Sequence, residues 1–294
     1  MTYPRSHLVD SRAPGFYHII SRCVRRSWLC GIDADTGQSY EHRRSWIEQR
    51  LESLAEQFSV EIYAYAVMSN HYHLVVYLDP NESLTDEEVA RRWVDIKPPR
   101  VNGEVDEHKR QLAIEEIRSS DERLTLYRRR LSSLSWYMRF LNHPIACRAN
   151  LEDGCKGHFW ESRFKSHALL DEAAVVACMA YVDLNPVRAK IATKLSECDH
   201  TSIKRRLKSR TEQLLPFAMN NARASSMINL SQGGYFTYLH NTGLLALQRA
   251  PPSPQLRARV LSMASYQRAF GSAQVLEHWL SKVGQQWTHG VALP

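Results

Sequence analysis

The sequence predicts an α+β fold. Two apolar runs, residues 60–67 and 71–78, have the alternation of strands, and a tight turn at residues 68–70 joins them into a hairpin. Apolar residues recur at helical spacing before this hairpin and again well after it. A strand-like run opens the pattern and another closes it. The elements therefore follow the order β-α-β-β-α-β, which is that of a ferredoxin-like sheet.

The first half of this pattern is visible in the residue spacing. Residues 15–24 predict the first strand. Residues 39–58 predict a helix, because their large apolar side chains fall on one side at helical spacing. The hairpin comes next. Residues 79–122 then form a charged, Pro-interrupted insertion in which we expect a short helix around residues 86–94.

The second half contains a helix, a strand and another helix. Residues 131–149 predict a helix that Pro144 must kink or break. Residues 159–169 predict the last strand. The final helix begins after Asp171, whose side chain can accept hydrogen bonds from the first free amides. Its apolar stripe has helical spacing and consists of Val175, Val176, Met179 and Val182.

The tripeptide His71-Tyr72-His73 lies on the second strand of the hairpin. Residues two apart on a strand point to the same face, so the two imidazoles can converge on one divalent metal ion, while Tyr72 points the other way. Alone, such a pair is more often simply two half-buried, hydrogen-bonded rings. The prediction of a metal site needs a second motif that supplies the remaining groups.

That second motif is Tyr181-Val182-Asp183-Leu184-Asn185-Pro186 at the end of the final helix. Tyr181 and Asn185 are four residues apart, so they share a face while the helix lasts. Pro186 disfavours helical geometry at Asn185, which we therefore expect at the helix end. If this helix packs beside the histidine strand, a phenol and an amide oxygen face the same point as the imidazoles. Asn185 is otherwise read as a cap for free carbonyl groups.

Charge is distributed unevenly along the chain. The net charge is +7, yet residues 79–122 carry 13 acidic and 7 basic side chains. The remaining residues are therefore strongly basic, which fits a polyanionic partner. Each basic cluster taken singly is equally well explained as a solvated helix face. The clusters that we expect to contact nucleic acid contain Arg22, Arg25 and Arg26 near the start and Lys204, Arg205 and Arg206 later.

Trp160, Arg163 and Lys165 lie on or beside the expected last strand. An aromatic ring with basic neighbours suits unpaired bases and phosphates, and we expect these residues to contact DNA. The simpler alternatives are a core anchor for Trp160 and an ion pair for Arg163. We expect surface positions for His158 and His167.

The remaining composition favours a cytoplasmic protein. The six cysteines include no Cys-x-x-Cys pair, so we interpret them as free thiols. No apolar stretch approaches the length of a membrane helix. The first residues lack an apolar signal region.

With these motifs in place, the chain resembles the REP-associated tyrosine transposases, which are single-tyrosine members of the HUH transposase and nuclease group. Four blocks occur in the order of the family. The resemblance covers roughly residues 14–200. The blocks are residues 17–24, the His71-Tyr72-His73 tripeptide, residues 157–165 and residues 181–189.

The resemblance implies a ferredoxin-like HUH nuclease fold and a DNA transposase that cleaves and rejoins single-stranded DNA. It implies Tyr181 as the nucleophile, a 5′-phosphotyrosine intermediate, and a divalent metal ion (Mg²⁺ or Mn²⁺) held by His71, His73 and Asn185. Arg188 belongs to the tyrosine motif and is expected to contact DNA. The expected partner is single-stranded DNA with a stem-loop of the REP kind, bound by a monomer or a homodimer.

Three alternatives remain open at this point. One is a domesticated protein that binds a DNA hairpin without cutting it or transposing. Another is an HUH replication initiator or relaxase, although these often carry two tyrosines on the catalytic helix. The third is an RNA-binding module, which shares this sheet topology but stacks bases on aromatic residues of the central strands.

The length of 294 residues suits one large domain, or a domain of about 200 residues with an accessory piece. We expect residues 1–200 to form the catalytic domain, with the insertion at residues 79–122, and residues 201–294 to form a helical accessory region. The clearest helix of that region spans residues 272–283, with Gly284 as its C-cap.

Overall fold

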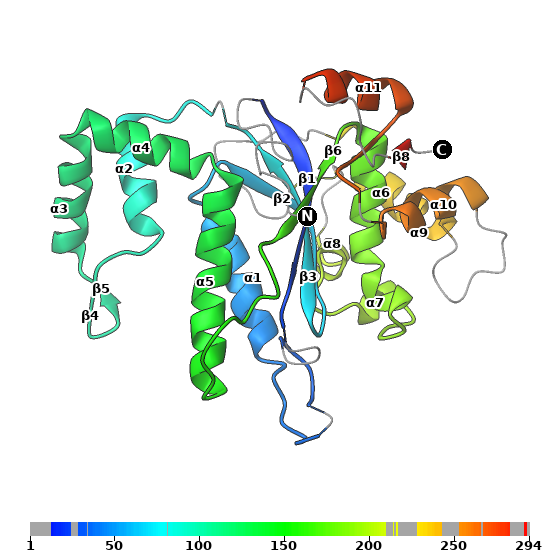
Figure 1. The fold of residues 1–294 in the computed structure, drawn as a ribbon, viewed down its shortest axis with the longest axis horizontal. Coiled ribbons are helices and arrows are strands. Elements are labelled where there is room, and N and C mark those ends of the chain that lie inside the picture. The colour runs from blue at the N-terminus through cyan, green and yellow to red at the C-terminus, as the bar shows by residue number, and fades with distance from the viewer. Residues whose placement is uncertain are drawn as a thin grey trace.

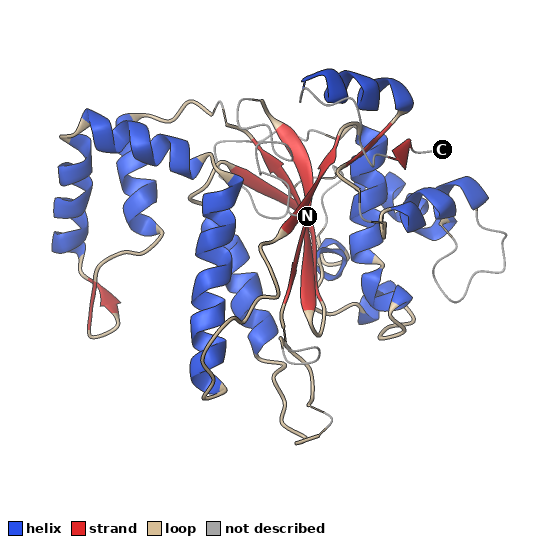
Figure 2. Ribbon diagram, viewed as in Figure 1, coloured by secondary structure: helices blue, strands red, loops and turns tan. Residues whose placement is uncertain are grey.

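The computed structural model describes most of the chain and centres on one mixed sheet between helices (Figure 1, Figure 2). No helix in the described part is long and apolar enough to cross a membrane. The described cysteines are all free thiols. The structure describes residues 13–24, 29–33, 35–80, 82–209, 214, 216, 228–242, 253–265, 267–282 and 291–292.

The sheet has six strands in the order β2-β3-β1-β6-β7-β8. Strand β3 is central and antiparallel to both of its neighbours, β2 and β1, and β6 is antiparallel to β1. The last two strands are short and parallel to their neighbours. The predicted α+β class is confirmed. The strands are β1 (Gly15–Arg22), β2 (Val60–Val67), β3 (His71–Leu78), β6 (Lys165–Leu169), β7 (Ala269–Gly271) and β8 (Val291–Ala292).

Helices cover the two faces of the sheet. Helices α1 (Arg43–Ala55) and α5 (Leu134–Glu152) pack together on one face, and α6 (Glu172–Asp183) packs against β2 and β3 on the other. Because side chains alternate along a strand, Tyr72 and Leu74 belong to the core under α5, whereas Val75 and Tyr77 belong to the core under α6. His73 is on the α6 face by the same alternation.

Pro144 lies inside α5 without ending it, so of the two expected outcomes, a kink or a break, the break does not occur. Proline has no amide hydrogen, so the carbonyl of Phe140, four residues earlier, loses its usual helical donor. Arg50 of α1 replaces that donor, since its Nε donates to the Phe140 carbonyl oxygen at 3.2 Å. The neighbouring helix thus satisfies the group that Pro144 frees.

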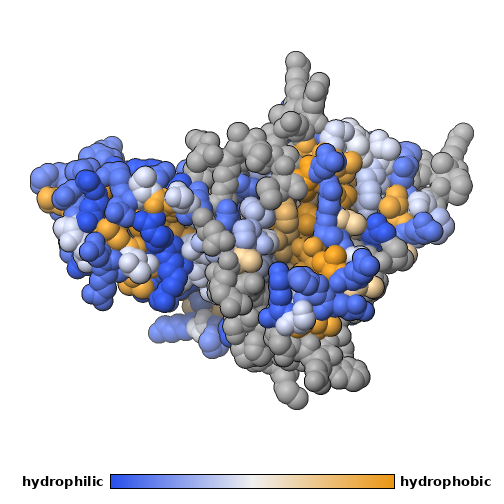
Figure 3. Space-filling model, turned by 90° about the horizontal axis from the view of Figure 1, so that it is seen from above, coloured by the Kyte–Doolittle hydropathy of each residue, from blue (hydrophilic) through white to orange (hydrophobic). Residues whose placement is uncertain are grey.

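The insertion forms a separate helical lobe beside the sheet (Figure 1, left). It contains more than the single short helix that the sequence predicted, and its upper face is mainly hydrophilic (Figure 3). Trp93 connects this lobe to α5 through an edge contact with Phe140 at 5.7 Å between ring centroids. The lobe consists of α2 (Asp86–Asp95), β4 (Arg100–Val101), β5 (Glu104–Val105), α3 (Glu107–Arg118) and α4 (Asp121–Leu131).

The last strand of the predicted core is shorter than expected. Strand β6 begins at Lys165 instead of residue 159. Residues before it leave the ladder and keep only an isolated bridge between Cys23 and Trp160. This irregular segment still places Phe159 in the core under α5. Its apolar pattern in the sequence could therefore not be distinguished from that of a strand.

The C-terminal part contributes helices and also two strands, β7 and β8, to the sheet. The expected helix at residues 272–283 is present as α11, and its predicted cap Gly284 lies outside the described residues. The proposed boundary at residue 200 stays a prediction. The helices are α7 (Asn185–Arg188), the 3₁₀ turn η2 (Leu195–Glu197), α8 (Ser202–Arg206), α9 (Gln232–Asn241), α10 (Pro254–Ser262) and α11 (Ala273–Lys282).

Candidate active site

The two histidines of the hairpin face each other at the start of β3. Their Nε2 atoms are 3.0 Å apart. His71 Nδ1 lies 2.6 Å from the side-chain oxygen of Asn70. Donation from this Nδ1 to Asn70 directs the lone pair of His71 Nε2 toward His73. Because β3 pairs on both sides, the backbone that carries the two rings is held firmly.

Two further histidines extend this pair across the sheet. His18 of β1 lies opposite His167 of β6 in the strand register. The ring of His18 stacks between those of His73 and His167, with centroid distances of 5.2 and 5.4 Å. His167 is only 2 % exposed, which corrects the expected surface position. Its Nδ1 donates to the carbonyl oxygen of Gln267.

All four imidazoles are held neutral by their surroundings. Burial lowers the pKa of His71 and of His167 to about 4. Burial also lowers the pKa of His18 and of His73 well below 6.5, and the nearby histidines add to this shift. A neutral imidazole keeps a lone pair, which is the form that binds a metal ion.

Tyr181 of α6 lies against this cluster. Its ring meets His73 edge-on at 5.5 Å and His18 at 5.9 Å between centroids. The guanidinium carbon of Arg188 lies 4.4 Å from the centre of the Tyr181 ring. The start of α6 is as predicted, because the Asp171 side chain accepts from the amide of Ala174 at 2.8 Å.

His71, His73 and Tyr181 line one cavity of about 290 Å³. Arg22, Arg163 and Lys165 line the same cavity, so three of the residues expected to bind DNA surround the predicted catalytic groups. His167, which was expected at the surface, also lines the cavity. Residues that the sequence did not single out complete the wall: Ile20, Glu161, Ser162, Ala264 and Ser265.

The cavity suits two adjacent ligands of a metal ion. In zinc sites nitrogen ligands lie about 2.0–2.1 Å from the ion, so two of them at right angles are about 3 Å apart. The separation of the two Nε2 atoms matches this value. Among the described residues, no group of three or more His, Cys, Asp and Glu side chains is arranged to hold a metal. A metal ion held by His71 and His73 would need an amide oxygen or water as a further ligand.

Asn185, the expected third ligand, is not brought into the lining of this cavity. It is buried, as the first residue of α7, and its carbonyl accepts from the amide of Ala189. Leu184 separates the end of α6 from this short helix. Asn185 thus lies at the helix end, as the proline predicted, and its role as a ligand stays a prediction.

Trp160 and the later basic cluster do not line the cavity that contains His71 and His73. Trp160 donates from its indole nitrogen to the Asn142 carbonyl at 2.9 Å. Lys204 pairs with Asp199 at 2.9 Å, and Arg205 pairs with Glu52. Arg25 and Arg26 lie outside the described residues.

Arg206 is buried, which corrects its predicted contact with DNA. It is 4 % exposed, and its guanidinium donates to the carbonyl oxygen of Tyr63. A buried guanidinium cannot reach a phosphate. It lies instead beside the buried carboxylate of Asp183, which accepts from Ser202 Oγ, from the Ile203 amide and from the Tyr235 hydroxyl.

Three other tyrosines of the hairpin and α5 have structural positions. Tyr65 is 1 % exposed and donates to Glu48 at 2.6 Å. Tyr77 and Tyr137 are buried in the two cores. None of these three lines the cavity that contains Tyr181.

Comparison with known proteins adds little to this geometry. No family model matches the chain, and no curated protein matches it. One solved structure that matches is a REP-associated tyrosine transposase bound to a REP hairpin. It has 14 % sequence identity and a TM-score of 0.38, over 77 % of this chain and 100 % of that one. A TM-score below 0.5 supports no conclusion about this chain.

Proposed function

We propose that the protein is a single-tyrosine DNA transposase of the HUH group. It would cleave and rejoin single-stranded hairpin DNA, with Tyr181 as the nucleophile. The observation that carries the proposal is the meeting of Tyr181 with His71 and His73 in one cavity. The strand order β2-β3-β1-β6 also agrees with the ferredoxin-like sheet that the sequence predicted.

The reaction forms one bond and breaks another at phosphorus. The Tyr181 oxygen attacks the phosphorus and gives up its proton, and the bond to the leaving 3′ oxygen breaks. That oxygen takes a proton to become a 3′-hydroxyl, while the 5′ phosphate stays on the tyrosine. An aryl oxide is also a good leaving group, so a 3′-hydroxyl can reverse the step and rejoin DNA.

His71 and His73 would hold the metal ion, Mg²⁺ or Mn²⁺, with Asn185 or water as a further ligand. When bound, such an ion polarises the scissile phosphate and offsets its charge. The basic residues of the cavity would position the DNA backbone. Arg22, Arg163 and Lys165 supply positive charge on the walls where the DNA backbone would lie.

One observation supports a second candidate, a hairpin-binding protein that does not cut DNA. Asn185 does not line the cavity that contains His71 and His73, so this lining gives no support to its role as the third ligand. The initiator or relaxase alternative has less support, because α6 carries one tyrosine where those enzymes often carry two.

A covalent adduct assay separates these candidates. The protein is incubated with single-stranded hairpin DNA and Mn²⁺, and a denaturing gel is used to detect protein linked to DNA. We expect an adduct with wild type and none with Tyr181→Phe, which should still bind DNA.

Tyr77→Phe is the matched control, because Tyr77 and Tyr181 are equally buried at 8 % exposure and both belong to the core under α6. This control should form the adduct. Peptide mapping should place the DNA on Tyr181. Binding without any adduct in wild type would favour the hairpin-binding protein.

A further inference from the structure

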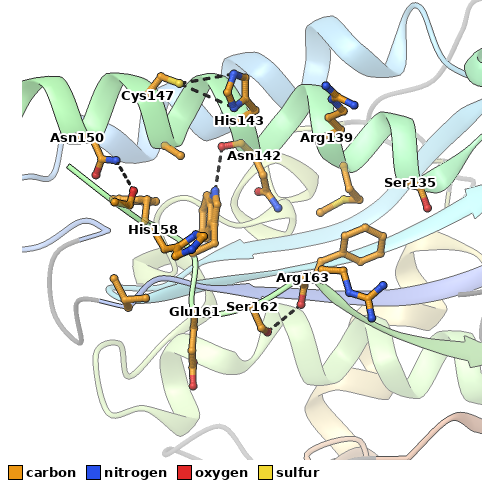
Figure 4. Close-up of a pocket in the computed structure, with 17 residues that line it drawn as sticks. Ser135, Arg139, Asn142, His143, Cys147, Asn150, His158, Glu161, Ser162 and Arg163 are labelled. Carbon is orange, nitrogen blue, oxygen red and sulfur yellow. Dashed lines mark hydrogen bonds between the residues drawn. The ribbon is translucent and has the colours of Figure 1, made fainter. Parts of the chain in front are cut away.

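Two hollows flank α5 on the face of the sheet opposite His73. Their volumes are about 970 and 1000 Å³, and both are lined by Arg139, His143 and Cys147 of α5. These three residues are exposed and four apart on α5. Residues 157–164 form the far wall of the first hollow (Figure 4), and residues 95–100 of the insertion form that of the second. We call the two hollows together the α5 groove.

The α5 groove is basic. Four exposed cations line it: Lys97, Arg100, Arg139 and Arg163. Two carboxylates also line it, and neither offsets these charges. Asp95 is paired with Arg110 at 2.6 Å and with Arg91 at 3.6 Å. The Glu161 side chain points away from α5 (Figure 4).

Aromatic rings lie among these cations. Trp136 and Phe140 line the hollow on the insertion side, and Trp160 and Phe164 line the other. The guanidinium carbon of Arg139 is 5.0 Å from the centre of the Trp136 ring. Cations that follow a backbone, interleaved with rings on which bases stack, are the features of a single-strand nucleic-acid site.

The α5 groove is adjacent to the cavity that contains Tyr181. Glu161, Ser162 and Arg163 line both the first hollow and that cavity. A DNA strand that passes over these three residues would leave the Tyr181 cavity and enter the first hollow of the α5 groove. Arg163 would be close to the backbone on both sides of this crossing.

We propose that the α5 groove binds single-stranded DNA as a second site, and that it receives the strand continuing from the Tyr181 cavity. The continuation of the strand from the Tyr181 cavity rests on the proposed function, whereas the binding of single-stranded DNA in the α5 groove does not. The inner wall belongs to the core helix α5, whereas the outer wall of the second hollow belongs to the insertion. The insertion would therefore extend the length of strand that the protein covers.

The test compares single-stranded DNA of two lengths by fluorescence anisotropy. Oligonucleotides of about 4 and about 16 nucleotides bracket the site sizes of a single basic, aromatic groove. The groove variant is Lys97→Ala/Arg139→Ala. The matched control, Arg129→Ala/Lys282→Ala, removes the same charges from exposed positions outside both sites.

We expect wild type and the control to bind the longer strand at least tenfold more tightly than the shorter one. The groove variant should lose this difference. Its plot of log affinity against log salt concentration should become shallower by about 1.4, since each phosphate contact to a single strand contributes about 0.7. An unchanged salt slope in the groove variant would overturn the proposal. Tighter binding of single-stranded RNA or of blunt duplex of the same sequence would also overturn it.

Failure of the groove can be distinguished from failure of the proposed function. A groove variant that binds the longer strand normally, with a covalent adduct in wild type, refutes the α5 groove alone. A groove variant that loses binding, with no adduct in wild type, supports the groove and refutes the transposase.

Discussion

His18 Nε2 lies 3.0 Å from Nδ1 of His73. If Nε2 of His73 gives its lone pair to a metal ion, the hydrogen of that ring is on Nδ1 and donates to His18. The hydrogen of His18 is then on its own Nδ1, a buried atom with no hydrogen-bond partner in the described structure. The position of the proton on the His73 ring is therefore linked to the ring of His18.

We predict that His18→Leu weakens Mn²⁺ binding about 10- to 100-fold, the usual effect of losing a partner behind a metal ligand. Titration followed by electron paramagnetic resonance measures this directly. His278→Leu, at an exposed position on α11, should bind Mn²⁺ as wild type does. Equal affinities in all three proteins would show that His18 does not orient His73.

His71→Ala and His73→Ala should each abolish the covalent adduct and leave DNA binding largely intact, because the basic residues of the cavity remain. EDTA should have the same effect on wild type. His108→Ala, an exposed change on α3, is the control and should retain the adduct. Undiminished adduct in excess chelator would rule out a metal-dependent reaction.

Acid should destabilise the fold through the histidine cluster. Each histidine has a pKa near 6.5 when unfolded, whereas burial holds the pKa of His71 and of His167 at about 4 in the fold. Between these values the unfolded chain binds more protons. The stability contributed by the neutral rings is therefore full above pH 6.5 and is lost as the pH falls toward 4.

Urea unfolding at a series of pH values measures this dependence. The midpoint should fall from pH 7 to pH 5 in wild type and fall less in His167→Gln. The exposed variant His108→Gln should keep the wild-type slope. A midpoint that does not change over this range would contradict neutral burial of the cluster.

The buried carboxylate of Asp183 predicts an effect on the stability of the fold. Tyr235 donates to its Oδ2 at 2.7 Å, and a hydrogen bond to a charged group contributes about 1.5–3 kcal/mol. Tyr235→Phe should lower the free energy of unfolding by about this amount. Tyr238→Phe is the control, because the Tyr238 hydroxyl has no hydrogen-bond partner in the described structure. Equal losses in the two variants would contradict this assignment.

The local parts of the site could be predicted from sequence. The hairpin at residues 60–78 and the start of the final helix depend on short-range spacing and on one capping side chain, so both were correct. His71, His73 and Tyr181 converge because α6 packs against β2 and β3, a condition that the sequence prediction had to assume.

The remaining residues depend on long-range pairing. His18 and His167 meet only because β1 pairs with β3 on one side and β6 on the other, in one particular register. No single-sequence signal sets that register. Arg206 is part of a basic run, and only tertiary packing decides that it is buried while Arg205 is partly exposed.

The pairing of β7 with β6 has a consequence for synthesis of the protein on the ribosome. Strand β6 ends at Leu169, yet its partner on the outer side begins at Ala269, and Ala264 and Ser265 complete the cavity wall. While the intervening residues are being translated, β6 is an open sheet edge, which is the form of strand most prone to wrong pairing. The histidine cluster would therefore be enclosed only after residues 264–271 have been translated, and a nascent chain stalled before that point would expose this edge to other chains.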